Sequence, residues 1–134
     1  MNTMKILVAD DDKDILEITA KKLKTVGYEI ITAIDGEEAL VKIRDEAPDI
    51  IILDLTMPKK DGFEVLQDIR KNPNVKKWQP VIILSGRREL EDMQKGYDCE
   101  ADHYITKPCS FEDIKKSIEL MIRLIPQHKL PSEG

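Results

Sequence analysis

The sequence of 134 residues lacks several features that would place it in a specialised class of protein. It has only two cysteines, which cannot build the disulfide framework of a small secreted domain and favour a reducing, intracellular setting. No apolar run approaches the roughly 20 residues of a membrane span, and the N-terminus shows no signal-peptide cleavage region. Basic residues are outnumbered 21 to 26 by acidic ones, and the net charge of −5 argues against nucleic acid as the main partner. We therefore expect a cytoplasmic protein that binds neither nucleic acid nor membranes directly.

Nucleotide-binding and zinc-binding motifs are also missing. The first apolar run is not followed by G-x-G-x-x-G, and no G-x-x-x-x-G-K-[ST] occurs, so a nucleotide-binding module is disfavoured. Neither Cys99 nor Cys109 belongs to a ligand-spaced set, and His103 and His128 are isolated in the sequence. Zinc is therefore an unlikely cofactor, and Cys109 is best interpreted as a small buried apolar side chain.

Five short apolar runs are the main structural signal in the sequence. Hydrophobic residues make up 41% and charged residues 35% of the chain, a composition typical of one globular domain. The runs are mostly β-branched and continuous, which is typical of strands covered on both faces of a sheet. The predicted strands are residues 6–9, 28–33, 50–53, 81–84 and 104–106.

Stretches with helical spacing separate and follow these runs. Their apolar residues are Ile15, Leu16, Thr19, Leu23 and Val26, then Ala39, Leu40 and Ile43, then Phe63, Leu66 and Ile69, then Leu90, Met93 and Tyr97, and last Phe111, Ile114, Ile118, Met121 and Ile125. Gly27 is predicted to end the first helix and Ser110 to cap the last. Strand and helix thus alternate five times, which predicts an α/β fold: a doubly wound, five-stranded parallel sheet with five helices.

Polar residues follow the predicted strands where ligands bind in such sheets, outside the carboxyl ends. Asp10 and Asp11 follow the first strand, Asp54 the third and Ser85 the fourth, and Lys107 follows the fifth. Clustered carboxylates repel one another unless a cation binds, and oxygen ligands suit Mg²⁺ or Mn²⁺. Burying the charged side chains of Asp10, Asp11 and Asp54 would not stabilise the fold unless they bind a ligand. The neighbouring Asp12 has a simpler interpretation as the N-cap of the first helix.

These positions carry motifs that resemble the receiver domain of two-component response regulators. The matching motifs are Asp10-Asp11, Asp54-Leu55-Thr56-Met57-Pro58, Asp61-Gly62, Ser85-Gly86 and Tyr104-Ile105-Thr106-Lys107-Pro108. The resemblance implies a flavodoxin-like fold with strand order 2-1-3-4-5. It covers residues 1–125 as one receiver domain and leaves 126–134 as a C-terminal tail or truncated linker.

The resemblance also implies a phosphorylation site. Asp54 would be the phosphoacceptor, receiving a phosphoryl group from a phosphohistidine on a sensor histidine kinase or phosphotransfer protein. Mg²⁺, with Mn²⁺ as the alternative, would be held by Asp10, Asp11, Asp54 and the backbone carbonyl of Thr56. With Lys107 the cation would balance the three carboxylates, and phosphorylation would then add about one negative charge.

The remaining matched residues would respond to that charge. Ser85 would hydrogen-bond a phosphoryl oxygen and Lys107 would pair with it, its bond to Pro108 being cis. Tyr104 would then act with Ser85 as a switch for the surface around the last strand, which a downstream protein or output domain would read.

Two alternatives concern function and assembly. An aspartyl-phosphate phosphatase of the haloacid-dehalogenase type uses similar residues, but Thr56 stands where such enzymes commonly carry a second aspartate. We therefore expect a phosphoacceptor switch that catalyses only its own phosphorylation and dephosphorylation. The apolar stripe of the last helix is best explained by core packing and would also suit a phosphorylation-dependent homodimer.

Overall fold

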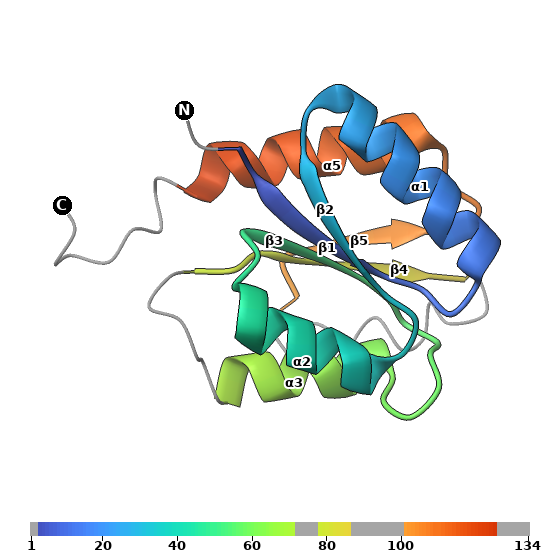
Figure 1. Cartoon of the computed structure of the whole chain (residues 1–134), viewed down its shortest axis with the longest axis vertical. Helices are drawn as coiled ribbons and strands as arrows, with labels where there is room; N and C mark the ends of the chain where they lie inside the picture. The colour runs from blue at the N-terminus through green and yellow to red at the C-terminus, as the bar shows by residue number, and fades with distance from the viewer. Residues whose placement is uncertain (1–2, 72–77, 87–100, 126–134) are drawn as a thin grey trace, which may run out of the picture.

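The computed structural model describes residues 3–71, 78–86 and 101–125 (Figure 1). Its strands are β1 (Lys5–Ala9), β2 (Glu29–Ala33), β3 (Ile50–Asp54), β4 (Val81–Ser85) and β5 (His103–Thr106). Its helices are α1 (Lys13–Val26), α2 (Gly36–Glu46), α3 (Gly62–Lys71) and α5 (Phe111–Leu124). Each predicted strand is therefore present, with its bounds within one residue of the apolar run that predicts it.

The strands form one parallel sheet in the order β2-β1-β3-β4-β5. This order confirms the predicted doubly wound α/β fold. Four of the five predicted helices lie in the part of the chain that the structure describes. The helix predicted around Leu90, Met93 and Tyr97 falls outside the described residues.

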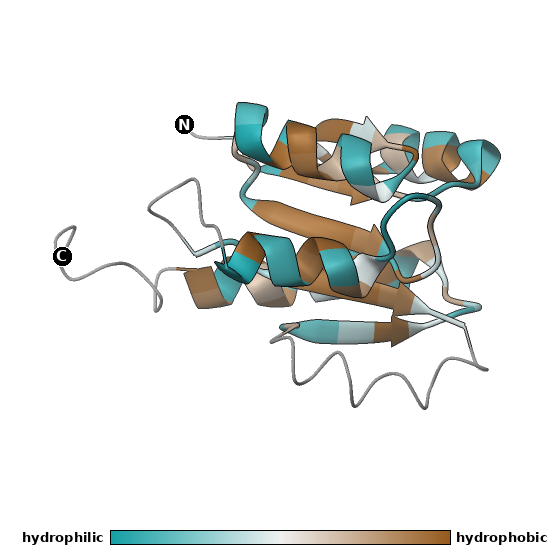
Figure 2. Ribbon diagram, turned by 90° about the horizontal axis from the view of Figure 1, so that it is seen from below, coloured by the Kyte–Doolittle hydropathy of each residue, from teal (hydrophilic) through white to brown (hydrophobic). Residues whose placement is uncertain are grey.

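Two apolar layers hold the helices on the sheet. In Figure 1, α1 and α5 lie on one side of the sheet and α2 and α3 on the other. Central strands such as β3 and β4 are buried along their whole length. Figure 2 accordingly shows strands that are largely hydrophobic and helices that alternate polar and apolar residues along their length. The sheet thus needs both helical layers to exclude water.

The apolar face predicted for the first helix needs a correction. Leu16 and Leu23 are buried as predicted, but Ile15 is 49% and Val26 42% exposed. The buried stripe of α1 instead includes Ala20, four residues after Leu16 and three before Leu23. The sheet therefore selects a narrower face of the helix than the apolar residues alone suggest.

The predicted helix ends are confirmed by their hydrogen bonds. The Asp12 carboxylate accepts from the backbone N–H of Asp14 at 3.1 Å and of Ile15 at 3.2 Å, as expected of an N-cap. Gly27 ends α1 in the left-handed conformation. Ser110 caps α5 in a reciprocal capping box with Asp113. None of the helices described has the length and apolar character to cross a bilayer.

Arg70 and Asp102 fix β5 at the amino ends of the strands. The Arg70 guanidinium donates to the Asp102 carboxylate at 2.8 Å and to the Gln79 carbonyl at 3.0 Å. The same carboxylate accepts from the backbone N–H of Val81 at 2.7 Å. This network joins the end of α3 to the starts of β4 and β5. By fixing the position of β5, it also helps to fix the position of Lys107, which follows the other end of that strand.

Candidate functional site

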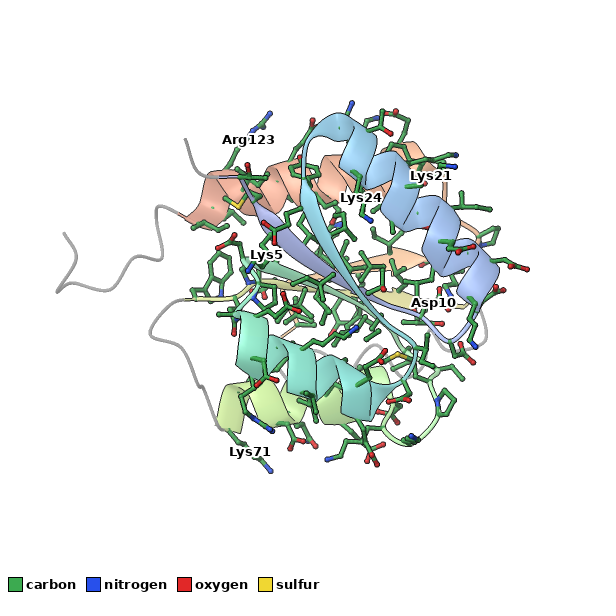
Figure 3. The ribbon with its side chains drawn as sticks, viewed as in Figure 1. Lys5, Asp10, Lys21, Lys24, Lys71 and Arg123 are labelled. Atoms are coloured by element: carbon green, nitrogen blue, oxygen red, sulfur yellow. The ribbon has the colours of Figure 1, made fainter. Side chains whose placement is uncertain are left out.

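The carboxyl ends of β1 and β3 bring three carboxylates together. Asp10 directly follows β1, and Asp54 is the last residue of β3. Single carboxylate oxygens of Asp10, Asp11 and Asp54 all lie within 4.8 Å of one another. Asp10 and Asp54 are buried, whereas Asp11 is exposed. Figure 3 shows Asp10 at the opposite end of β1 from Lys5, so the cluster occupies the edge of the sheet that the sequence predicts.

Lys107 supplies the positive charge at this edge. Its Nζ lies 3.0 Å from Oδ2 of Asp54 and 3.7 Å from Oδ2 of Asp10. Its backbone N–H donates to the Ser85 carbonyl at 2.6 Å, which holds the residue beside the end of β4. The Lys107–Pro108 peptide bond is cis, as the family resemblance implies. One ammonium therefore faces two buried carboxylates.

Burial controls the ionisation of Asp54. Desolvation, with a smaller contribution from the Asp10 charge, raises the pKa of its carboxyl to about 6 against the opposing effect of Lys107. Burial by itself would lower the pKa of Lys107, but the hydrogen bond and charge of Asp54, with the charge of Asp10, raise it overall. The site thus favours a proton or a cation beside Asp54.

The raised pKa of Asp54 predicts a stability effect in metal-free protein. Because the pKa of Asp54 is higher in the folded than in the unfolded protein, proton binding at Asp54 favours the folded state. This contribution to the free energy of unfolding is complete below the ordinary carboxyl pKa and is lost as the pH rises through about 6. The Asp54→Asn variant cannot ionise, so we expect it to be more stable than wild type at pH 7 by about 1–3 kcal/mol. Urea unfolding in EDTA from about pH 4 to about pH 8 measures the difference. An equal pH dependence of the two proteins would contradict it.

The side chains of Ser85 and Tyr104 lie on the same face of the sheet, on the neighbouring strands β4 and β5. Ser85 pairs with Thr106 and Ile83 pairs with Tyr104, so alternation places all four side chains on one face. Ser85 is fully buried, and its Oγ has no hydrogen-bond partner in the described part of the structure. Tyr104 packs against the core beneath α2 and α3. Ser85 therefore carries a buried hydroxyl with an open hydrogen-bonding capacity.

The loop after β3 contributes a contact that the sequence does not reveal. The backbone N–H of Thr56 donates to the Asp54 carboxylate. The family resemblance implies only a carbonyl role for Thr56, and that role stays a prediction. The turn signals Pro58 and Gly62 mark a loop here without indicating its hydrogen bonds. Cys109 is half-buried, and burial raises the pKa of its thiol, which favours the packing role predicted for it.

The donor set suits a small divalent cation. Three close carboxylates with a single lysine leave a net negative charge, and all the side-chain donors are hard oxygen ligands. The exposed carboxylate of Asp11 gives an ion a route of approach from solvent. Asp10, Asp11 and Asp54 therefore fit Mg²⁺, in agreement with the chemistry expected from the sequence.

Fold and site together define a signalling domain of the receiver type, and comparison with known proteins identifies the family. The family model for the response regulator receiver domain matches residues 6–119, and the chain belongs to this family. It is thus a receiver domain of two-component response regulators, a class whose members bind Mg²⁺ at an acidic pocket and interact with histidine kinases and output domains.

Individual relatives differ in length. The chain is 38% identical over 138 residues to a probable transcriptional regulator, ycf27, of Porphyridium aerugineum, covering 100% of this chain and 56% of that protein. It is 42% identical to protein PilG of Pseudomonas aeruginosa, covering 87% and 85%. The Francisella response regulator 1452 receiver domain has 35% identity and a TM-score of 0.81, with 90% and 98% covered. The chain thus spans about half the length of ycf27 and most of PilG.

Proposed function

We propose that this domain is a phosphoacceptor switch in which Asp54 receives a phosphoryl group from a phosphohistidine of a sensor histidine kinase or phosphotransfer protein. The observation that carries the proposal is the surroundings of Asp54. This buried carboxylate lies 3.0 Å from the Lys107 ammonium and within 4.8 Å of two further carboxylates. Packing alone does not favour such an arrangement, because buried charges lower stability unless they bind something.

The chain's own groups can carry the transfer. A carboxylate oxygen of Asp54 attacks the phosphorus, the P–N bond breaks, and the electron pair leaves with the imidazole nitrogen. Asp10, Asp11, Asp54 and the Thr56 carbonyl would hold Mg²⁺, which when bound supplies electrostatic stabilisation of the phosphoryl oxygens. Lys107 pairs with the charge that develops on those oxygens, while the Thr56 N–H steadies the attacking carboxylate.

Ser85 and Tyr104 would carry the signal away from the site. The Ser85 Oγ is a free donor that can hydrogen-bond a phosphoryl oxygen on Asp54. Movement of Ser85 would vacate space on the face that it shares with Tyr104, and the tyrosine would fill it. The result is a shift between two populations of one fold, detectable at the surface around β5 and α5.

The broader context follows from this role. Residues 1–125 would form the receiver domain and 126–134 a tail or truncated linker, with the protein acting in the cytoplasm. The output would be a downstream protein, an output domain as in longer regulators, or a phosphorylation-dependent homodimer. Ile114, Ile118 and Met121 of α5 are buried in the core, so a dimer would use the exposed side of that helix.

The stoichiometry of labelling by acetyl phosphate tests the proposed function. We expect Mg²⁺-dependent incorporation of at most one phosphoryl group per chain, with none in EDTA, because one carboxylate accepts the group. Intact-protein mass spectrometry measures this incorporation. Rapid multiple turnover on a phosphate monoester such as p-nitrophenyl phosphate would contradict the switch and favour the phosphatase alternative.

A further inference from the structure

The loop between β3 and α3 contains an unusual turn at Lys59. Lys59 has φ = 69°, and among the described residues only Ala47 is another non-glycine residue with positive φ. The backbone N–H of Lys60 donates to the Pro58 carbonyl at 2.7 Å, which closes a three-residue turn centred on Lys59. A turn of this kind with positive φ at its centre is rare and strained for an L-residue. Something around it must hold this conformation.

The start of α2 supplies that support. The backbone N–H of Gly36 donates to the same Pro58 carbonyl at 3.4 Å. A Cβ at Gly36 would clash with the Lys60 carbonyl oxygen, so only glycine allows this approach of the two backbones. The buried carboxylate of Asp35, which caps α2 through the Glu38 N–H at 2.8 Å, lies 3.6 Å from Lys59 Nζ. The turn is thus held by two backbone contacts and one ion pair.

The same loop touches the reactive carboxylate. It begins directly after Asp54 and closes through a hydrogen bond from the Gly62 N–H to the Leu55 carbonyl at 2.9 Å. A Cβ at Gly62 would lie 2.8 Å from the Asp54 carbonyl oxygen, so the closed loop sits tightly against the end of β3. Within it, the Thr56 N–H donates to the Asp54 carboxylate. Because the loop is only a few residues long, a change of backbone direction at Lys59 must also change the backbone beside Asp54.

We propose that the left-handed turn at Lys59, which packs against the start of α2 at Asp35 and Gly36, is a positioning element that sets the backbone of Thr56 against Asp54 and so determines the affinity of the site for Mg²⁺. Lys59 is a positioning residue here, because it contacts none of the reacting groups. The inference rests on the proposed function. The conformation of the turn matters more than the Lys59 charge, since an ion pair with a 58% exposed lysine contributes little.

Substitutions at Lys59 separate conformation from charge. Gly, Asn, Ala and Val all remove the ammonium, but tolerance of positive φ falls in that order. We expect Mg²⁺ affinity, measured by isothermal titration calorimetry on the unphosphorylated protein, to fall in the same order. Lys59→Gly and Lys59→Asn should bind within about fivefold of wild type, the limit for loss of an exposed ion pair. Lys59→Val should bind about five- to thirtyfold more weakly than Lys59→Asn.

Control variants and stability measurements make the outcomes distinct. Lys60→Gln removes the neighbouring ammonium, which pairs with Asp68 at 2.9 Å outside the turn, and should leave Mg²⁺ affinity within twofold. Asp35→Asn keeps the cap and should behave as Lys59→Asn does. Thermal unfolding of each variant shows whether weaker Mg²⁺ binding results from an altered turn or from an unfolded protein. If Lys59→Val does not fold, the Gly, Asn and Ala variants suffice for the comparison.

Equal Mg²⁺ affinities across the folded Lys59 series, with wild type binding normally, would overturn the positioning role alone. Failure of the wild-type protein to bind Mg²⁺ at all would overturn the proposed function as well. An affinity that falls in the order Gly, Asn, Ala, Val while Lys60→Gln stays unchanged would establish the turn as the element that positions the loop.

Discussion

Asp54→Ala is expected to abolish Mg²⁺-dependent phosphorylation of the protein by acetyl phosphate. Alanine removes the carboxylate that lies 3.0 Å from the Lys107 ammonium, and with it the nucleophile of the proposed transfer. The loss should be complete rather than partial, because phosphoryl transfer depends on a positioned acceptor and the remaining groups stabilise charge without replacing it. Quantitative intact-protein mass spectrometry after incubation with acetyl phosphate and Mg²⁺ measures the loss.

A matched aspartate provides the control for this variant. Asp45 is exposed on α2, away from the acidic cluster, and Asp45→Ala should be labelled as wild type is. We expect Asp54→Ala itself to fold, because the site already disfavours a charged Asp54 in the absence of a cation. Labelling of Asp54→Ala at the wild-type stoichiometry would contradict the assignment of the acceptor.

Asp11→Asn is expected to remove most of the stabilisation of the fold by Mg²⁺. A ligand that binds only the native state raises the unfolding free energy, by about 2.7 kcal/mol at a hundredfold excess over its dissociation constant. The wild-type melting temperature should therefore rise as Mg²⁺ is added. In the variant the rise should nearly vanish, because a neutral amide replaces one of the three close carboxylates of the cluster.

The adjacent residue offers a close control for this second prediction. Asp12→Asn removes the same charge one position away, and asparagine caps a helix about as well as aspartate does. Asp12→Asn should keep the Mg²⁺-dependent rise in melting temperature. Since Asp11 is exposed, its substitution should leave the metal-free stability nearly unchanged. Equal Mg²⁺ responses of Asp11→Asn and Asp12→Asn would argue that nonspecific charge, rather than a site, produces the effect.

The sequence predicts the sheet and the positions of the site residues for the same physical reason. Strands buried on both faces must be continuously apolar, so the polar residues that end them are conspicuous. Parallel pairing then brings Asp10, Asp54 and Lys107 to one edge, whatever the details of the loops. The sequence pattern by itself therefore predicts that these side chains lie close together.

Other features depend on tertiary contacts that local patterns do not encode. Whether Ile15 is buried depends on how α1 lies on the sheet, and apolar spacing predicts only which residues could face it. The left-handed conformation of Lys59 depends on backbone contacts with Gly36, some twenty residues earlier in the chain. Lysine has no preference for positive φ, so its presence in the sequence does not predict this conformation. Likewise, the Thr56 N–H contact depends on the final path of the loop.

Chemical mapping of the phosphorylated residue tests the proposed switch most directly. Borohydride reduction of the acyl phosphate formed from acetyl phosphate and Mg²⁺, followed by peptide mass spectrometry, identifies the modified carboxylate. We expect modification at Asp54, with none at Asp10 or Asp11, because among these three carboxylates only Asp54 combines burial, the close Lys107 ammonium and the Thr56 N–H. Modification of another residue, or an unmodified Asp54 in a labelled protein, would contradict this account.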